Sequence, residues 1–310
     1  MTNGTDSRKW PVPVYLLLPL AAAIVYALGS IVIKRGLALG VTMDQSFHIT
    51  NLFVGLVFLP LLFFEQKEIE WLLIWKPIVM GIVFFLGNWL TFEGIKRGDV
   101  SLVTPIMGTK VVWVAIGLVV LTGQVPSTAL WVAAVMTAVG IFVMGLGDLK
   151  GGSHLVLTVS LTLSSAALFG ICDVLVSWWS ADFGAPTFLA IGSITVALLS
   201  ITLLAFRRQT SLVLPPLLRK WAWWGGFLIG LQAIAMGMSL SLFRDATGIN
   251  VVYASRGLWV IVLVVVLGPI LGNSEHRESG RAFWWRVFGT VILTTAIVIA
   301  VIDRAQNGAT

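Results

Sequence analysis

The sequence predicts an all-α integral membrane protein whose ten transmembrane helices form two inverted five-helix repeats. The 310 residues are 58% hydrophobic and 11% charged, with a mean hydropathy of +0.96, whereas a soluble domain is about 25% charged. The apolar residues form continuous segments instead of the alternating pattern of a membrane β-barrel. In addition, part of the second half of the chain repeats part of the first half.

A membrane-spanning helix needs about 20 mainly apolar residues, and ten segments of the chain meet this requirement. We predict these spans at residues 14–33, 47–64, 77–95, 100–121, 129–146, 155–177, 186–206, 221–243, 247–271 and 283–302. Most of the tryptophans lie near the ends of these segments, where aromatic side chains meet lipid headgroups. The connections are short, so we expect no soluble domain. The localisation is therefore a membrane, crossed several times, which in a bacterium is the cell (inner) membrane.

The remaining composition argues against a metalloprotein, an enzyme or a nucleic-acid-binding protein. The net charge of +6 comes from Lys and Arg residues that flank membrane helices and face lipid headgroups. Cys172 is the only cysteine, which excludes an internal disulfide and a cysteine-based metal cluster. The three histidines share no spacing, and the sequence contains no HExxH, GxSxG, Walker A or haem motif. We expect no cofactor.

A polar, glycine-rich stretch, GDLKGGSH at residues 147–154, divides the ten segments into five and five. We predict a first five-helix repeat at residues 1–146 and a second at residues 155–310, joined by this linker. Shifting the second half by 146 positions places Lys110 on Arg256 without a gap. The same shift superposes Asp99 on Asp245, Thr109 on Ser255 and Trp113 on Trp259, and a rougher alignment superposes Tyr26–Ser30 on Phe169–Asp173.

Consecutive repeats of five helices must enter the membrane from opposite sides, because five is an odd number. Such inverted repeats are typical of secondary transporters, whose substrate site lies near the membrane midplane between the repeats. A two-fold axis between the repeats would place Lys110 and Arg256 at similar depth in the membrane. The repeat thus predicts a shared central cavity.

The sequence resembles the drug/metabolite transporter superfamily in its EamA-type, ten-helix form. The most specific part is GIKRGDVSLVTPIMGTKVVWVAIGLVVLTGQVPSTALWVAAVMTAVGIFVMG, residues 94–145, with Pro105 early in a helix and a glycine-rich helix after a short loop. The chain departs from this pattern at two positions: Val251 in the second copy stands opposite Pro105, and Gln124 stands where the family usually has an acidic residue. The resemblance implies a carrier that moves small metabolites through a central cavity by alternating access. It implies no particular substrate.

Lys110 and Arg256 each lie near the middle of a predicted span. A charged residue at the centre of a membrane helix costs roughly 2.5–3.5 kcal/mol on insertion scales, and such residues usually face the bundle interior or a water-filled cavity. One interpretation is structural, with the two bases paired to Glu93 and Asp173. The other is that they bind a substrate with a carboxylate or a phosphate, since two bases at one depth repel each other unless an anion lies between them. Duplication of the base favours the second interpretation.

Other polar and aromatic residues complete the candidate substrate site. Helix periodicity places Met107 and Trp113 on the face of Lys110, and Tyr253 and Trp259 on the face of Arg256. The polarity of neighbouring positions adds Asn250 in the ninth span, and Asn88 and Trp89 in the third. Glu93 and Asp173 are candidates either for ion pairing or for carrying a coupling proton.

The partners expected from these features are membrane lipid and a small anionic or amphoteric substrate, such as an amino acid. Coupling to protons is possible, and the sequence does not determine whether the protein is a monomer or a homodimer. A non-transporting receptor or scaffold is the alternative function. The orientation also stays open. The distribution of Lys and Arg favours an N-terminus outside the cell, whereas the family resemblance favours one inside.

Overall fold

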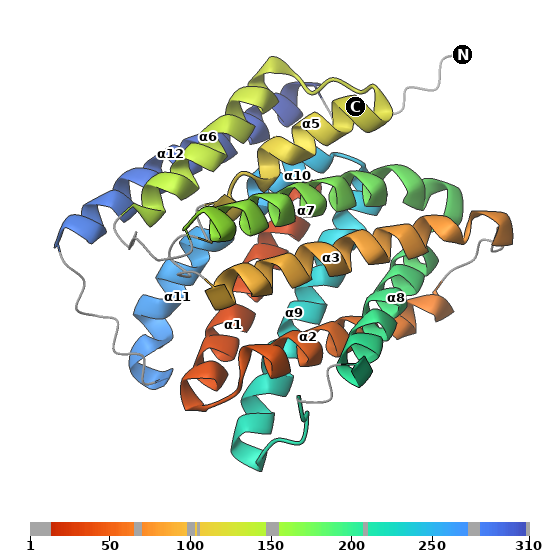
Figure 1. The fold of residues 1–310 in the computed structure, drawn as a ribbon. Coiled ribbons are helices and arrows are strands. Elements are labelled where there is room, and N and C mark those ends of the chain that lie inside the picture. Colours follow the sequence, from red (N-terminus) through yellow and green to blue (C-terminus); the bar gives the residue numbers. More distant parts are fainter. Residues whose placement is uncertain are drawn as a thin grey trace.

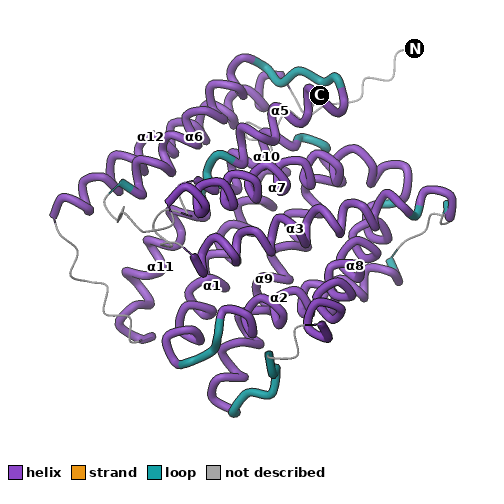
Figure 2. Tube along the Cα trace, viewed as in Figure 1, coloured by secondary structure: helices purple, strands orange, loops and turns teal. Residues whose placement is uncertain are grey.

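The structure is a computed structural model, and it describes residues 14–64, 70–97, 103, 106–146, 155–206, 210–271 and 280–307. Within these ranges the chain is helical and contains no strand (Figure 2). Nine helical segments among the described residues are long and apolar enough to cross a membrane. The prediction of an all-α integral membrane protein is therefore confirmed.

The first half of the chain contains five apolar helical regions, and all but α5 begin within four residues of their predicted positions. They are α1 (Leu17–Leu39), α2 (Met43–Phe58) extended by a 3-10 turn at Leu59–Phe63, α3 (Trp75–Arg97), α5 (Lys110–Thr122) and α6 (Thr128–Gly145). The region of α5 is predicted at residues 100–121, but of its first ten positions only residues 103 and 106–109 are described. The described helix is consequently shorter than a full span.

The second half follows the same order. Its helices are α7 (Leu155–Phe183), α8 (Ala185–Phe206), α9 (Pro216–Phe243), α10 (Ala246–Tyr253), α11 (Arg256–Leu271) and α12 (Gly280–Asn307). The predicted ninth span is thus divided into α10 and α11. The predicted linker at residues 147–154 lies outside the described residues.

Local sequence explains several helix boundaries. Thr42 and Gln45 form a reciprocal capping box at the start of α2, in which the Gln45 N–H donates to Thr42 Oγ1 (3.2 Å) and the Thr42 N–H donates to Gln45 Oε1 (3.0 Å). Ser127 caps α6 by accepting the N–H of Leu130. The α1 helix ends at Gly40, whose φ of 117° is a left-handed conformation that glycine adopts without steric cost.

Contacts between the two halves come in matched pairs. In the first matched pair of contacts, α1 packs against α9 and α7 packs against α3. In the second, α5 packs against α7 and α11 packs against α1. The α6 and α12 helices, the last of each half, pack against each other along one edge of the bundle (Figure 1). A two-fold axis between two five-helix units would produce this pattern. The division into two inverted repeats stays a prediction, with which this packing agrees.

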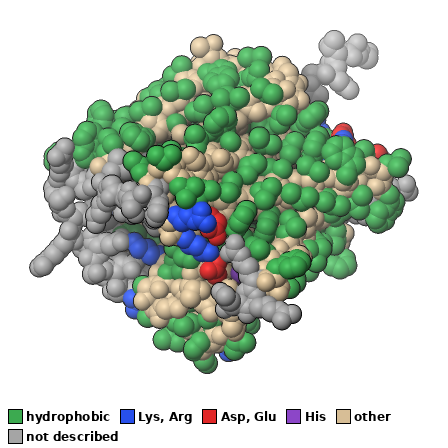
Figure 3. Space-filling model, viewed as in Figure 1, with side chains coloured by type: hydrophobic (Ala, Val, Ile, Leu, Met, Phe, Trp, Pro, Cys, Tyr) green, Lys and Arg blue, Asp and Glu red, His purple; other side chains and the backbone are tan. Residues whose placement is uncertain are grey.

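The outer surface suits a lipid environment. Figure 3 shows hydrophobic side chains over most of the visible face, with Lys, Arg, Asp and Glu side chains gathered mainly in one place. Exposed large apolar residues occur on most spans, including Leu198 on α8, Val266 on α11 and Phe288 on α12. In water such a surface would drive aggregation, so the exposure of these side chains fits burial in lipid.

Candidate functional site

The two central bases occupy equivalent positions at two helix breaks. Lys110 is the first residue of α5, and Arg256 is the first residue of α11. Just before each base the backbone forms a turn with a hydrogen bond between residues three apart. The Thr109 N–H donates to Ile106 O and the Ser255 N–H donates to Val252 O, both at 3.0 Å. Each base therefore sits at the N-terminal end of a half-helix, where the helix dipole adds positive potential.

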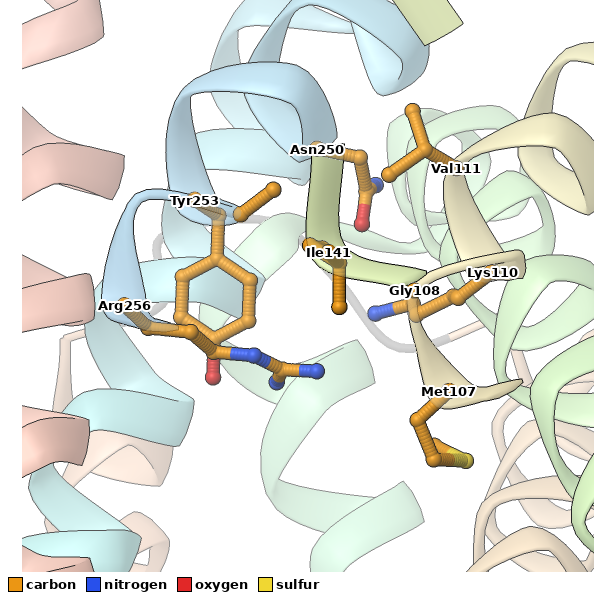
Figure 4. A pocket seen from close by; sticks show the side chains of 9 residues that line it. Met107, Gly108, Lys110, Val111, Ile141, Asn250, Tyr253 and Arg256 are labelled. Carbon is orange, nitrogen blue, oxygen red and sulfur yellow. The ribbon is translucent and has the colours of Figure 1, made fainter. Parts of the chain in front are cut away.

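A small cavity lies between the two breaks (Figure 4). Its lining residues are Met107, Gly108, Lys110, Val111, Ile141, Asn250, Tyr253, Ala254 and Arg256. Its volume is about 10 Å³, enough for about one water molecule. Figure 4 shows the Lys110 ammonium and the Arg256 guanidinium reaching into the same space from opposite sides. This conformation does not hold a metabolite between them.

Lys110 has a counter-charge in the second half of the chain. Its Nζ lies 2.6 Å from Oδ2 of Asp173 on α7, and both residues are 8% exposed. Its ammonium also lies 5.8 Å from the ring centres of Phe169 and Tyr253. The pair is formed because α5 packs against α7, so it ties one half to the other. Lys110 is accordingly close to neutralised before any ligand binds.

Arg256 is held differently. Its Cζ lies 4.8 Å from the ring centres of both Tyr26 and Tyr253, a distance that allows cation–π attraction. Among the described residues, no carboxylate lies within 4.0 Å of the guanidinium nitrogens. The Tyr253 ring is oriented by its hydroxyl, which donates to Gln232 Oε1 at 2.6 Å. Within the described part of the chain, Arg256 therefore has no carboxylate in direct contact with it.

Asn250 contributes an unpartnered oxygen to the cavity. Its side chain is 1% exposed, and its Nδ2 donates to Ala246 O at 2.9 Å. Its Oδ1 has no hydrogen-bond partner among the residues that the structure describes. Because a carbonyl can only accept, the amide cannot be turned round without losing the bond to Ala246. A buried acceptor without a donor is costly, so this oxygen is suited to a donor on a ligand or to a water molecule.

Glu93 lies away from the two bases. Its carboxylate is 3.4 Å from Lys96 Nζ and 3.1 Å from Arg97 Nη2, near the end of α3. Lys96 in turn contacts Asp44 at the start of α2. Of the two acids considered for the bases, only Asp173 reaches one of them.

The other predicted site residues divide into two groups. Met107, Asn250 and Tyr253 line the cavity together with the bases. The remaining four lie outside its lining: Trp113 packs on Gly170, Trp259 and Trp89 pack against buried apolar clusters, and Asn88 donates to Asn51 Oδ1 at 2.7 Å.

The structure adds residues that the sequence interpretation did not assign to the site. Tyr26 and Phe169 lie against the two bases, and Ile141 of α6 closes one wall. The rough alignment of Tyr26–Ser30 with Phe169–Asp173 already put the two rings in equivalent positions. This alignment was the only indication in the sequence that Tyr26 and Phe169 occupy corresponding positions beside the two bases.

Discontinuous helices that carry charged residues at the centre of a bundle define the architecture of secondary transporters. Residues 13–146 match the EamA-like transporter family. The first half of the chain is thus similar to a family of membrane transporters, and the nine apolar helices among the described residues indicate a multi-pass integral membrane protein.

Comparison of folds leads to a related result. A solved crystal structure of a protein superposes with a TM-score of 0.69 over 93% of this chain and 96% of that chain. The two sequences are 16% identical, so the likeness establishes a shared fold alone. No curated protein matches the sequence significantly.

Proposed function

We propose that the protein is a secondary active transporter that carries a small organic anion or amphoteric metabolite through the cavity between Lys110 and Arg256. The observation that carries this proposal is the charge of the cavity. Counted over the described residues, two bases and one acid, Asp173, give a net charge of one positive unit in a buried region. A substrate with a carboxylate or a phosphate would neutralise that charge, and an Arg guanidinium offers a planar set of donors to such a group.

The size of the cavity supports transport by alternating access. A volume of about 10 Å³ is far below the roughly 300 Å³ or more of a small-molecule site, so a substrate can bind only after the two halves separate. The helix breaks before Lys110 and Arg256 are points at which such a movement could bend the chain. The central ion pair joins opposite halves and would have to follow the movement.

Counterflow in proteoliposomes tests the transport proposal. Purified protein is first screened by thermal shift against metabolite pools, and the stabilising compounds are then loaded into vesicles to drive uptake of the labelled compound. A carrier exchanges internal for external substrate, whereas a receptor, a scaffold or a channel does not. A stabilising compound without counterflow would contradict the proposal.

Three variants connect the transport activity to the cavity. Arg256→Ala is expected to weaken substrate affinity most, and Lys110→Ala to weaken it less, because Asp173 already neutralises Lys110. Arg97→Ala is the matched control, since its side chain is 48% exposed and pairs with Glu93 away from the cavity. Normal affinity in both cavity variants would exclude the bases as the anion site. Stabilisation by organic cations alone would contradict an anionic or amphoteric substrate.

A further inference from the structure

The surroundings of the two bases share one feature, an aromatic ring from the first helix of the opposite half. Lys110 lies over the ring of Phe169 on α7, and Arg256 lies over the ring of Tyr26 on α1. The α1 and α7 helices are the first of each half, and their alignment places Tyr26 on Phe169. Each base therefore stacks on the equivalent ring of the opposite half.

The difference lies one turn further along these helices. In α7 the residue four positions after Phe169 is Asp173, which pairs with Lys110 at 2.6 Å. In α1 the residue four positions after Tyr26 is Ser30. Residues four apart lie on one face of a helix, so the alignment places Ser30 on the face of α1 that corresponds to the Asp173 face of α7. The Ser30 hydroxyl donates to Ala27 O at 2.8 Å and brings no charge.

We infer that the carboxylate of the transported substrate binds beside Arg256 and Ser30, in the place that Asp173 fills in the other half. This inference rests on the proposed transport function and specifies its anion subsite. One carboxylate brings the charge of the cavity to zero, as a matched pair of acids would. A phosphate monoester, with a charge near two negative units, would leave an excess negative charge.

The buried Oδ1 of Asn250 extends the subsite to a second group on the ligand. This oxygen lines the same cavity as Arg256 and has no donor. A ligand that carries an N–H or O–H donor next to its carboxylate satisfies both groups at once. The ligand class is therefore a small monocarboxylate with a neighbouring hydroxyl or amino group. Both groups supply the donor, but only the hydroxy acid also brings the charge of the cavity to zero, because the ammonium of an amino acid restores one positive unit.

The first test needs no ligand and examines the geometry. Ser30→Asp and Ser30→Asn are compared by thermal unfolding of purified protein, in the native background and with Arg256→Met. If Ser30 faces Arg256, the aspartate pairs with it, and Ser30→Asp melts several degrees above Ser30→Asn. This difference should disappear or reverse with Arg256→Met. An Asp–Asn difference of the same size in both backgrounds overturns the subsite, whatever the transport assay shows.

The second test examines the ligand class with a matched set of three-carbon probes. Lactate and alanine carry the donor and propionate does not, and glycerol 3-phosphate supplies the dianion. We expect lactate or alanine to stabilise the native protein more than propionate or glycerol 3-phosphate at equal ionic strength. Ser30→Asp should weaken that binding at least tenfold more than Ser30→Asn. Asn250→Leu should remove the preference over propionate.

The outcomes of the two proposals can be separated. Stabilisation by propionate equal to that by lactate and alanine, or no stabilisation by either donor-bearing probe, overturns the ligand class. Binding of lactate or alanine without counterflow overturns the transport function and leaves the subsite in place.

Discussion

Lys110 and Asp173 lie in opposite halves of the chain, and their Nζ and Oδ2 atoms are 2.6 Å apart in the interior of the bundle. The pair joins α5 to α7 next to the central cavity. Taking two charges out of water is costly, and their mutual attraction offsets this cost only while both partners are present. The pair is therefore a sensitive point for stability as well as for transport.

Removing only the acid should destabilise the protein strongly. Asp173→Asn leaves the Lys110 charge buried without its partner, which costs about 3–5 kcal/mol in comparable buried pairs. Replacing both partners, with Lys110→Met and Asp173→Leu together, should restore most of that loss. Thermal unfolding in detergent measures both changes. A double variant as unstable as Asp173→Asn would mean that lost packing, and not an unpaired charge, causes the effect.

A glycine on α7 determines how closely α5 approaches it. A Cβ added to Gly170 would lie 2.8 Å from Trp113 Cβ and 3.0 Å from the backbone nitrogen of Val114. Gly170→Ala should therefore push the two helices apart and lower stability by about 1–3 kcal/mol, the usual range for overpacking. Gly257→Ala is the control, because its new Cβ would meet only Met144 Cε at 3.8 Å. Equal melting temperatures for the two variants would contradict a tight helix crossing at Gly170.

A second buried ion pair joins Asp245 to Arg304, and it lies next to Tyr15 near the start of the described chain. Arg304 donates to both oxygens of Asp245, at 2.9 and 2.7 Å, and the Tyr15 hydroxyl donates to Asp245 Oδ2 at 2.7 Å. Asp245 also caps α10 by accepting the N–H of Gly248. This network joins the starts of α1 and α10 to the end of α12.

Substitutions in this network should have graded effects on stability. Tyr15→Phe removes one hydrogen bond to a charged group and should cost about 1.5–3 kcal/mol. Asp245→Asn removes the carboxylate that accepts two hydrogen bonds from the buried Arg304 and should cost more, about 3–5 kcal/mol. Lys76→Ala is the comparison, since Asp182 in its pair is 51% exposed and such pairs contribute about 0–1 kcal/mol. Chemical or thermal unfolding of the three variants gives the order. A loss with Lys76→Ala as large as that with Asp245→Asn would contradict it.

The sequence indicates the architecture better than the site. Ten spans are visible because a hydrocarbon-length apolar segment is a local property of the chain. The equivalence of Lys110 and Arg256 was predicted from the sequence alone, because a gap-free shift of 146 positions superposes them. The choice between Glu93 and Asp173 as a partner depends on which helix faces α5, and helix spacing alone does not determine it. The helix break before Arg256 is also hidden, since no proline marks it and its turn is formed by Ala254 and Ser255.

Tyr253 contacts both bases through one ring. Its ring centre is 5.8 Å from Lys110 Nζ and 4.8 Å from Arg256 Cζ, so the ring attracts the two cations and keeps them apart. Tyr253→Leu removes this attraction, which is worth about 0.5–2 kcal/mol for each cation, and should lower substrate affinity by roughly tenfold because Arg256 is no longer held in place.

Tyr253→Phe separates the ring from the hydroxyl. It keeps the stacking and loses the hydroxyl, which donates to the buried Gln232 Oε1 and also contacts the Arg256 side chain, so we expect a loss of stability of about 1–3 kcal/mol with a smaller loss of affinity than in Tyr253→Leu. Binding by thermal shift and uptake by counterflow, measured on the same preparations, distinguish the two effects. Equal affinity in the Leu and Phe variants would show that the ring does not position Arg256, and the guanidinium would then have to be oriented by Tyr26 alone.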